Sequence, residues 1–343
     1  MFEFADAEAA IGGQAVTLAQ GIAAAAAMLG VAAAPVIGGL RTDVAGAVAA
    51  AALARRLGAV LDHAESAAAL SDLAAMRIEG GIVTTPAQAR ALADCLLIVG
   101  DIGPEFLALL APGRPPPLDA EQRPRQVLRL AAGADVTQRL GLLRALVKRR
   151  GVAAANELVT LAAALRAARY GVVVWSGMQL PPLAVEMLCG LIEDLNDATR
   201  FAGLPVPAPG NAAGVAQALT WETGFPFRMA FREGVPRHDP WRYDAARMAT
   251  SGEADAVLWV DALGGGPPPW QGRVKLVALV PPRVSFAAAP EVTLAVGRPG
   301  VDHAAVLYHP AAFGLLATLP TAPQARPTAT EILGRIAAAL TPC

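Results

Sequence analysis

The amino-acid sequence predicts an α/β protein that contains two doubly wound domains. Short, strongly apolar runs that are typical of buried strands recur along the whole chain. Segments with helix-capping signals separate these runs, and such a β-α-β alternation implies parallel strands joined by right-handed crossovers. The length of 343 residues is sufficient for about two domains, each with its own core.

The first half of the chain shows this alternation clearly. After the apolar run at 35–40, Thr42 or Asp43 can cap a helix that ends before Gly58, a residue suited to the left-handed position after a helix. A capping box with proline at the first helical position opens another helix at 85–88. We expect strands at 35–40, 58–62, 95–100 and 127–133, a helix at 135–150 and a loop at 103–124.

The second half repeats the pattern. Leu158, Leu161 and Leu165 recur at helical spacing and mark one face of a helix. A second capping box at 328–331 opens the last helix. We expect a helix at 183–198, strands at 171–177, 275–280, 292–296 and 304–310, and a strand that runs into a glycine-rich turn at 255–266.

The segment from 210 to 240 differs from the rest of the chain. Most of the protein is an alanine, leucine and valine background, whereas this segment shifts to Asn, Trp, Thr, Gly, Phe, Arg and Pro at irregular spacing. Such a run shows neither a helical stripe nor a strand alternation. Because long irregular segments inside compact domains are usually functional or interfacial, we expect a site or a docking surface here.

The ends of the expected strands locate a second candidate region. In open α/β sheets, ligands bind beyond the carboxyl ends of the strands, where loops converge. The loops that follow Gly38, Asp62, Gly100, Gly177 and Asp261 are therefore the candidate crevice. None of them carries the glycine pattern of a dinucleotide site, a phosphate-binding P-loop or a hydrolase nucleophile elbow.

Composition narrows the class of protein. A net charge of −1 provides no basic field for nucleic acid or for an anionic membrane. The longest uncharged run, at 9–40, is broken by Gln, Gly and Pro, so no membrane span is expected. Acidic residues occupy the first positions, where a secretory signal would be cationic, and we expect a cytoplasmic protein. The hydrophobic fraction of 55% favours apolar surface patches and hence membership of a larger assembly.

The cysteines do not predict a metal site. Cys95, Cys189 and Cys343 are too far apart in the sequence for a CxxC-type motif. Cys95 and Cys189 both lie in apolar surroundings and are expected to be buried structural thiols, while Cys343 is terminal.

Several segments together resemble the B subunit of formylmethanofuran dehydrogenase, a shortened relative of the molybdopterin oxidoreductases. The most specific is TWETGFPF followed by FREGVPRHDP, at 220–240. The others are PVIGGLRTDVAGA at 35–47, GAVLDHAES at 58–66, TPAQARALAD at 85–94 and LNDATRF at 195–201. The resemblance implies two Rossmann-like domains, with 59–151 inserted into a domain formed by 1–58 and 152–343. Composition alone permits two consecutive halves equally well.

The chain departs from this family where the redox chemistry is located. The family's iron–sulfur cluster needs several thiolates, and this chain has no cysteine before Cys95. The family's cysteine or selenocysteine ligand of molybdenum or tungsten, and the histidine after it, correspond to Ala68 and Ala69. The family's Asn-Pro turn, which a histidine and an arginine follow, corresponds to 100–104 here, and these polar residues are lost. The resemblance therefore implies that the iron–sulfur domain, the cluster and the molybdopterin or tungstopterin are lost.

As a member of this family without redox centres, the chain resembles the B subunit of the formyltransferase/hydrolase complex of methylotrophic bacteria. That resemblance implies a non-catalytic structural subunit, with an amidohydrolase-like A subunit, a C subunit and a formyltransferase D subunit as partners. Such a complex converts formyl-tetrahydromethanopterin to formate via formyl-methylofuran in formaldehyde oxidation, and polyglutamyl methylofuran would lie nearby. Two alternatives remain: a minimal molybdenum- or tungsten-pterin oxidoreductase with a non-cysteine ligand, and a pterin-binding module without chemistry.

The candidate binding or interface residues lie in the irregular segment. They are Asn211, Trp221, Thr223, Phe225, Arg228, Arg232 and Arg237. Trp221, Phe225 and the nearby Phe227 can line a crevice or a partner surface, or they can pack in the core. The arginines can bind a phosphate or a carboxylate-rich ligand, or they can form structural ion pairs. Asn211 is more simply explained as fixing a loop through hydrogen bonds from its side chain to the backbone.

No catalytic residue is expected. The histidines are scattered along the chain, and no carboxylate has an evident partner for acid–base work. These histidines are His63, His238, His303 and His309, and the carboxylates are Asp62, Glu65 and Glu222.

Overall fold

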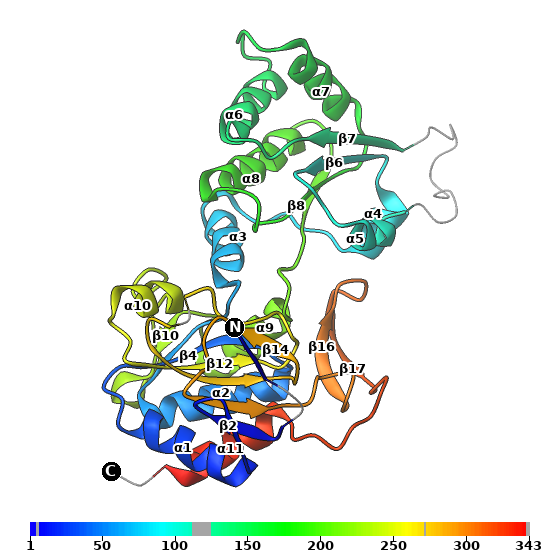
Figure 1. Cartoon of the computed structure of the whole chain (residues 1–343). Helices are drawn as coiled ribbons and strands as arrows, with labels where there is room; N and C mark the ends of the chain where they lie inside the picture. Colours follow the sequence, from blue (N-terminus) through cyan, green and yellow to red (C-terminus); the bar gives the residue numbers. More distant parts are fainter. Residues whose placement is uncertain (5–6, 112–124, 271, 341–343) are drawn as a thin grey trace. The chain divides into compact units, whose positions relative to one another are not determined.

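The computed structural model describes residues 1–4, 7–111, 125–270 and 272–340. The chain divides into two compact units, each with mixed α/β structure and a parallel sheet (Figure 1). The first unit comprises Met1–Ser66, Pro209–Tyr308 and Leu315–Cys343. The second unit comprises Ala67–Ala208 and His309–Gly314.

The first unit is built on a nine-stranded sheet with the order β11-β10-β5-β4-β12-β13-β15-β2-β3. The strands from β5 to β15 are parallel, and antiparallel strands flank them on both sides. Their bounds are β2 Ala9–Ile11, β3 Gln14–Val16, β4 Pro35–Arg41, β5 Val60–Leu61, β10 Met229–Ala230, β11 Arg237–His238, β12 Ala256–Asp261, β13 Lys275–Val280 and β15 Val292–Ala295. Two further sheets have two strands each. In one, β1 (Phe2–Phe4) pairs antiparallel with β14 (Val284–Phe286), and the other joins β16 (Ala305–His309) and β17 (Gly314–Thr318).

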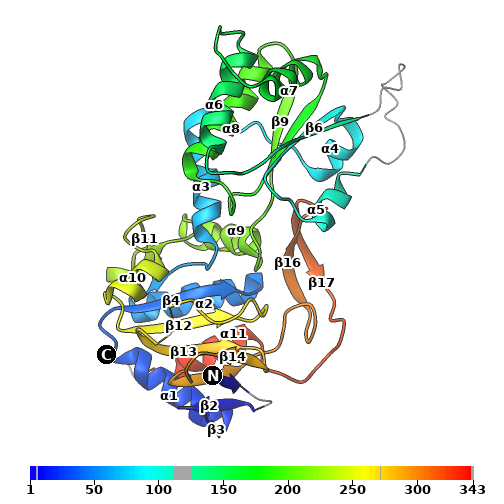
Figure 2. The ribbon, with the colours of Figure 1, turned by 45° about the horizontal axis from the view of Figure 1, so that its top comes forward.

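Helices cover both faces of this sheet (Figure 2). The helices α1 (Leu18–Gly30), α2 (Val44–Leu57) and α11 (Ala329–Ala339) pack against one another on one face. On the other face, α10 (Ala245–Ser251) joins a cluster that includes Trp259. Successive side chains of a strand point to opposite faces, so each uninterrupted apolar strand supplies both layers of the core.

The second unit contains a four-stranded parallel sheet in the order β7-β6-β8-β9. Its strands are β6 Cys95–Val99, β7 Gln126–Leu130, β8 Gly171–Trp175 and β9 Phe201–Pro205. Its helices are α3 Ser66–Glu79, α4 Pro86–Leu92, α5 Pro104–Leu109, α6 Val136–Val147, α7 Asn156–Ala167 and α8 Pro182–Asn196. Side chains of α6, α7 and α8 cover one face, and side chains of α4 and the segment around α5 cover the other.

The second unit is larger than the expected insertion at 59–151. It extends to Ala208 because β8 pairs with β6 in the same sheet, with Cys95 opposite Gly171, and β9 pairs with β8. It begins after Ser66 because β5 pairs with β4 in the first unit, with Val36 opposite Val60. The expected boundary at 151 was therefore wrong.

The local helix signals are confirmed. Asp43 caps α2, and Gly58 follows it in the left-handed conformation with φ 63°. The capping boxes at 85–88 and 328–331 both form. In the expected loop at 103–124, α5 forms instead, with Pro104 at its start; residues 112–124 lie outside the described part of the chain.

The irregular segment is more regular than expected. Its first part forms α9 (Ala212–Thr223), which packs on α2, and a short 3-10 turn follows at Arg232–Gly234. The apolar positions Val215, Ala218 and Leu219 are buried at helical spacing within this helix. After Gly224, the short strands β10 and β11 and this 3-10 turn alternate with loops. No helix in the described residues is long and apolar enough to cross a membrane.

Candidate functional site

The carboxyl ends of β4, β5 and β12 bring charged side chains together in the first unit. Arg41 ends β4, Asp261 ends β12, and Asp62 and His63 follow β5. Parallel strands place these ends at one edge of the sheet, which is where open α/β sheets bind ligands. This edge is the candidate site.

Arg41 connects two carboxylates across this edge. Its guanidinium donates a hydrogen bond to Glu65 and lies 3.7 Å from the Asp261 carboxylate. The side chain also lies against two backbones, since a Cβ at Gly210 or at Gly265 would come within 2.5 Å and 2.4 Å of it. Glycine at both positions makes room for the arginine.

The Asp261 carboxylate organises the glycine-rich turn after β12. It accepts hydrogen bonds from the backbone N–H groups of Gly264 and Gly265 at 3.0 Å and of Gly266 at 2.6 Å. Burial raises the pKa of Asp261, although these bonds and Arg41 oppose the shift. The acceptors of this side chain are thus used within the turn.

Arg228 forms a second ion-pair centre. Its guanidinium lies 2.7 Å from Asp244 and 3.7 Å from Asp62, and it donates to the Ser66 hydroxyl at 3.0 Å. Asp62 is 3% exposed and accepts the Ala245 N–H through Oδ2, while its Oδ1 has no partner among the described residues. Burial raises the pKa of Asp62 from 3.8 to about 7, against the opposing charge of Arg228.

His63 is a buried, neutral side chain. Its Nδ1 accepts the N–H of Glu65 at 3.0 Å, so the neutral ring carries its proton on Nε2, which donates to the Gly210 carbonyl at 3.1 Å. Its ring lies 5.4 Å from that of Phe227. Burial lowers the pKa of His63 to about 4. Both ring nitrogens are therefore occupied by intrachain bonds.

Asn211 connects the turn after β4 to strand β16. Its amide nitrogen donates to the Thr42 carbonyl at 2.8 Å, and its amide oxygen accepts the Tyr308 N–H at 2.8 Å. Its backbone is left-handed, with φ 61°, a conformation that asparagine tolerates better than most residues. The interpretation of Asn211 as a residue that fixes a loop agrees with these bonds.

The other predicted residues divide into structural and exposed ones. The Thr223 hydroxyl donates to the Leu219 carbonyl, and the Phe225 ring stacks on His238 with centroids 5.3 Å apart. Trp221 is 72% exposed. Arg232 is exposed, and so is Arg237, which pairs with Glu233. Of the three arginines, only Arg228 belongs to the sheet-edge cluster.

Ala68, a largely buried residue, and Ala69 lie in the first turn of α3, at the start of the second unit. Cys95 and Cys189 are free and buried, as expected, and burial raises their pKa to about 12 and about 11. Cys343 lies outside the described residues. The described residues contain no group of three or more His, Cys, Asp or Glu side chains that could hold a metal ion.

The sequence interpretation missed Arg41 and the role of Asp261. A signal for Asp261 was present, since an aspartate followed by three glycines at 264–266 can accept several backbone N–H groups from one turn. For Arg41 no local signal existed, because its partners come from distant parts of the chain.

Comparison with known proteins places the chain in a family. No protein-family model matches it. Over 306 residues, 84% of this chain and 84% of the relative, it is 35% identical to the B subunit of the formyltransferase/hydrolase complex of Methylorubrum extorquens. The chain belongs to this B-subunit family.

The other similarities agree with membership of the B-subunit family. A chain in the crystal structure of the M. extorquens formyltransferase/hydrolase complex with methylofuran matches with a TM-score of 0.89 and 34% identity, over 97% of this chain and 98% of that one. The B subunit of the tungsten-containing formylmethanofuran dehydrogenase 2 of Methanocaldococcus jannaschii is 36% identical over 91 residues, 26% of this chain and 21% of the relative. The predicted resemblance is thereby confirmed.

Proposed function

We propose that this chain is the non-catalytic structural subunit of a formyltransferase/hydrolase complex. The complex would convert formyl-tetrahydromethanopterin to formate via formyl-methylofuran, with an amidohydrolase-like A subunit, a C subunit and a formyltransferase D subunit as partners. The observation that carries this proposal is the match over 97% of the chain, at a TM-score of 0.89, to a chain of such a complex. Both units of the chain are included in that match.

In this proposal both units are Rossmann-like domains of the kind found in molybdopterin oxidoreductases, and no iron–sulfur domain is present. Support comes from the parallel sheets and from the helices on both faces of each sheet.

The protein would hold neither a molybdenum or tungsten pterin nor an iron–sulfur cluster. Ala68 and Ala69, at the family's ligand position, offer only methyl groups, which do not fit a soft metal. The raised pKa values of Cys95 and Cys189 keep both thiols protonated, whereas metals bind the thiolate. Arg41 and Arg228, two cations at the sheet edge, are each paired with carboxylates of the chain itself.

Affinity purification tests the proposal directly. The protein would be tagged at its chromosomal locus, and the proteins that co-purify would be identified and quantified by mass spectrometry, with metal analysis of the same sample. Stoichiometric recovery of a formyltransferase and an amidohydrolase, without molybdenum or tungsten, is expected. Recovery of iron–sulfur electron carriers together with either metal would instead establish the redox enzyme.

A further inference from the structure

The second unit has an open sheet edge. Among the described residues, only the segment 82–84 lies beyond its last strand, β9. This segment forms two hydrogen bonds with β9: the Gly203 N–H donates to the Ile82 carbonyl at 2.7 Å, and the Thr84 N–H donates to the Gly203 carbonyl at 3.0 Å. In such a parallel bridge, the N–H and C=O groups of the intervening residue, Val83, point away from the sheet. No described residue bonds to them. Val83 therefore presents a free donor and a free acceptor.

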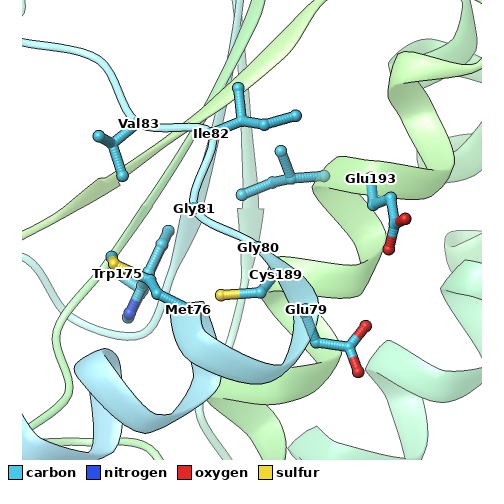
Figure 3. A pocket seen from close by; sticks show the side chains of 10 residues that line it. Met76, Glu79, Gly80, Gly81, Ile82, Val83, Trp175, Cys189 and Glu193 are labelled. Atoms are coloured by element: carbon cyan, nitrogen blue, oxygen red, sulfur yellow. The ribbon is translucent and has the colours of Figure 1, made fainter.

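An apolar pocket of about 200 Å³ lies directly behind this edge (Figure 3). Trp175, Cys189 and Ile192 form its buried part, and Met76 contributes from α3. The Trp175 indole is held in place by its hydrogen bond to the Asp72 carboxylate at 2.9 Å. The pocket is thus an apolar recess within a single unit, next to unpaired backbone groups.

The surroundings of the pocket are apolar and acidic. Ile82 and Val83, two adjacent branched side chains of the pocket lining, are 48% and 47% exposed. Glu79 and Glu193 line the same pocket and lie on one side of it in Figure 3. Neither carboxylate forms an ion pair with a described residue.

We propose that an extended segment of another subunit of the complex binds this edge as an added strand. Its backbone would pair with the N–H and C=O of Val83, and one apolar side chain would enter the pocket. A neighbouring Lys or Arg would face Glu79 and Glu193. Strand addition uses main-chain hydrogen bonds for affinity and a side-chain pocket for specificity, and all these components are present here. The inference rests on the proposed function, since it requires the chain to be part of a complex.

Three variants of the intact complex test this site, each compared with wild type after purification through a tag on this chain. Val83→Pro removes an N–H that the chain itself does not use, whereas Val83→Ala keeps that N–H. Glu79→Lys with Glu193→Lys reverses the charge of the rim. We expect Val83→Pro and the double charge reversal to lower the recovery of one partner by about tenfold or more, and Val83→Ala to lower it less.

The control is Val127→Ala, which trims an exposed valine on β7 at the opposite edge of the same sheet and is expected to leave recovery unchanged. Thermal unfolding of each purified variant separates loss of binding from loss of folding. Amide exchange adds an independent readout: the Val83 amide should exchange about tenfold or more slowly in the complex than in the free chain. The Thr84 amide, already bonded to Gly203, should be protected in both.

A photo-crosslinking side chain at position 82 identifies the occupant. Crosslinks to an apolar segment with a Lys or Arg, in a formyltransferase or hydrolase subunit, support the proposal. Crosslinks to a second copy of this chain overturn it. So does an intact complex in which the Val83 amide exchanges as fast as in the free chain and Val83→Pro leaves partner recovery unchanged. Both outcomes leave the proposed function in place. Absence of those subunits from the wild-type purification would refute the proposed function itself.

Discussion

Asp62 and His63 are adjacent and nearly excluded from water, and burial shifts their pKa values in opposite directions. The pKa of Asp62 rises from 3.8 to about 7, and that of His63 falls from 6.5 to about 4. At a pH between the unfolded and folded pKa values of either residue, the folded and unfolded chains bind different numbers of protons there. Each residue therefore makes the free energy of unfolding depend on pH.

The two dependences have opposite signs. Between about pH 4 and 7, folded Asp62 keeps a proton that the unfolded chain has released, so its contribution to stability falls as pH rises. Between about pH 4 and 6.5, the unfolded chain binds a proton at His63 that the folded chain does not, so this contribution rises with pH. At about 1.4 kcal/mol per pH unit, these contributions amount to about 4 and about 3 kcal/mol and nearly cancel below pH 6.5.

Single substitutions reveal this cancellation. For Asp62→Asn, the free energy of unfolding relative to wild type should increase by about 4 kcal/mol between about pH 4 and 7. For His63→Gln it should decrease by about 3 kcal/mol between about pH 4 and 6.5. Urea unfolding at constant ionic strength over this range measures both changes. Other titrating groups cancel in each difference, including Asp72, whose pKa burial raises to about 6. Profiles that run parallel to wild type would refute the reasoning.

Three further predictions follow from the same contacts. Gly210→Ala should lower the free energy of unfolding more than Gly252→Ala. Both glycines have positive φ, but only a Cβ at Gly210 would collide with Arg41. Gly252→Ala should cost about 1 kcal/mol in urea unfolding. Arg228→Met should cost about 3 kcal/mol at pH 8 and less at pH 5, where Asp62 is protonated and needs no cation. Trp221→Gln should leave the free energy of unfolding within about 0.5 kcal/mol of wild type but reduce co-purification of partner subunits. Phe225→Gln should lower the free energy of unfolding by about 1–3 kcal/mol, because the Phe225 ring stacks on His238. A Trp221 variant with normal recovery of partners would exclude that side chain from an interface.

Those parts of the fold that depend on nearby residues could be predicted from the sequence. The cap at Asp43, the left-handed Gly58 and both capping boxes are local bonds, and each stands where the pattern indicated. The extent of the second unit could not be predicted in this way. It depends on β8 pairing with β6, and the apolar run at 171–175 carries no information about which strand it will join.

The same distinction applies to the candidate site. Asn211 could be interpreted from its type and its flanking glycine, because asparagine is suited to left-handed turns. The helix α9 was not predicted because its alanine-rich stretch belongs to a segment that, with Trp221 and the aromatic residues after it, shows no regular apolar spacing as a whole. Arg41 gave no signal at all, since the Glu65 and Asp261 carboxylates reach it only after the sheet has assembled.

The ion pairs at the sheet edge account for this polar cluster without a bound ligand. Arg41 and Arg228 are each held by two carboxylates, and most of these side chains are shielded from water. Removing one member of such a group leaves the others charged and buried, which costs more than the pair contributes. The arginines and carboxylates of this cluster hold one another, and the glycines at 210 and 265 make room for Arg41, so these residues depend on one another. On this view charge at the carboxyl ends of strands is weak evidence for catalysis, and the decisive property is whether a charged group has bonding capacity left for a ligand.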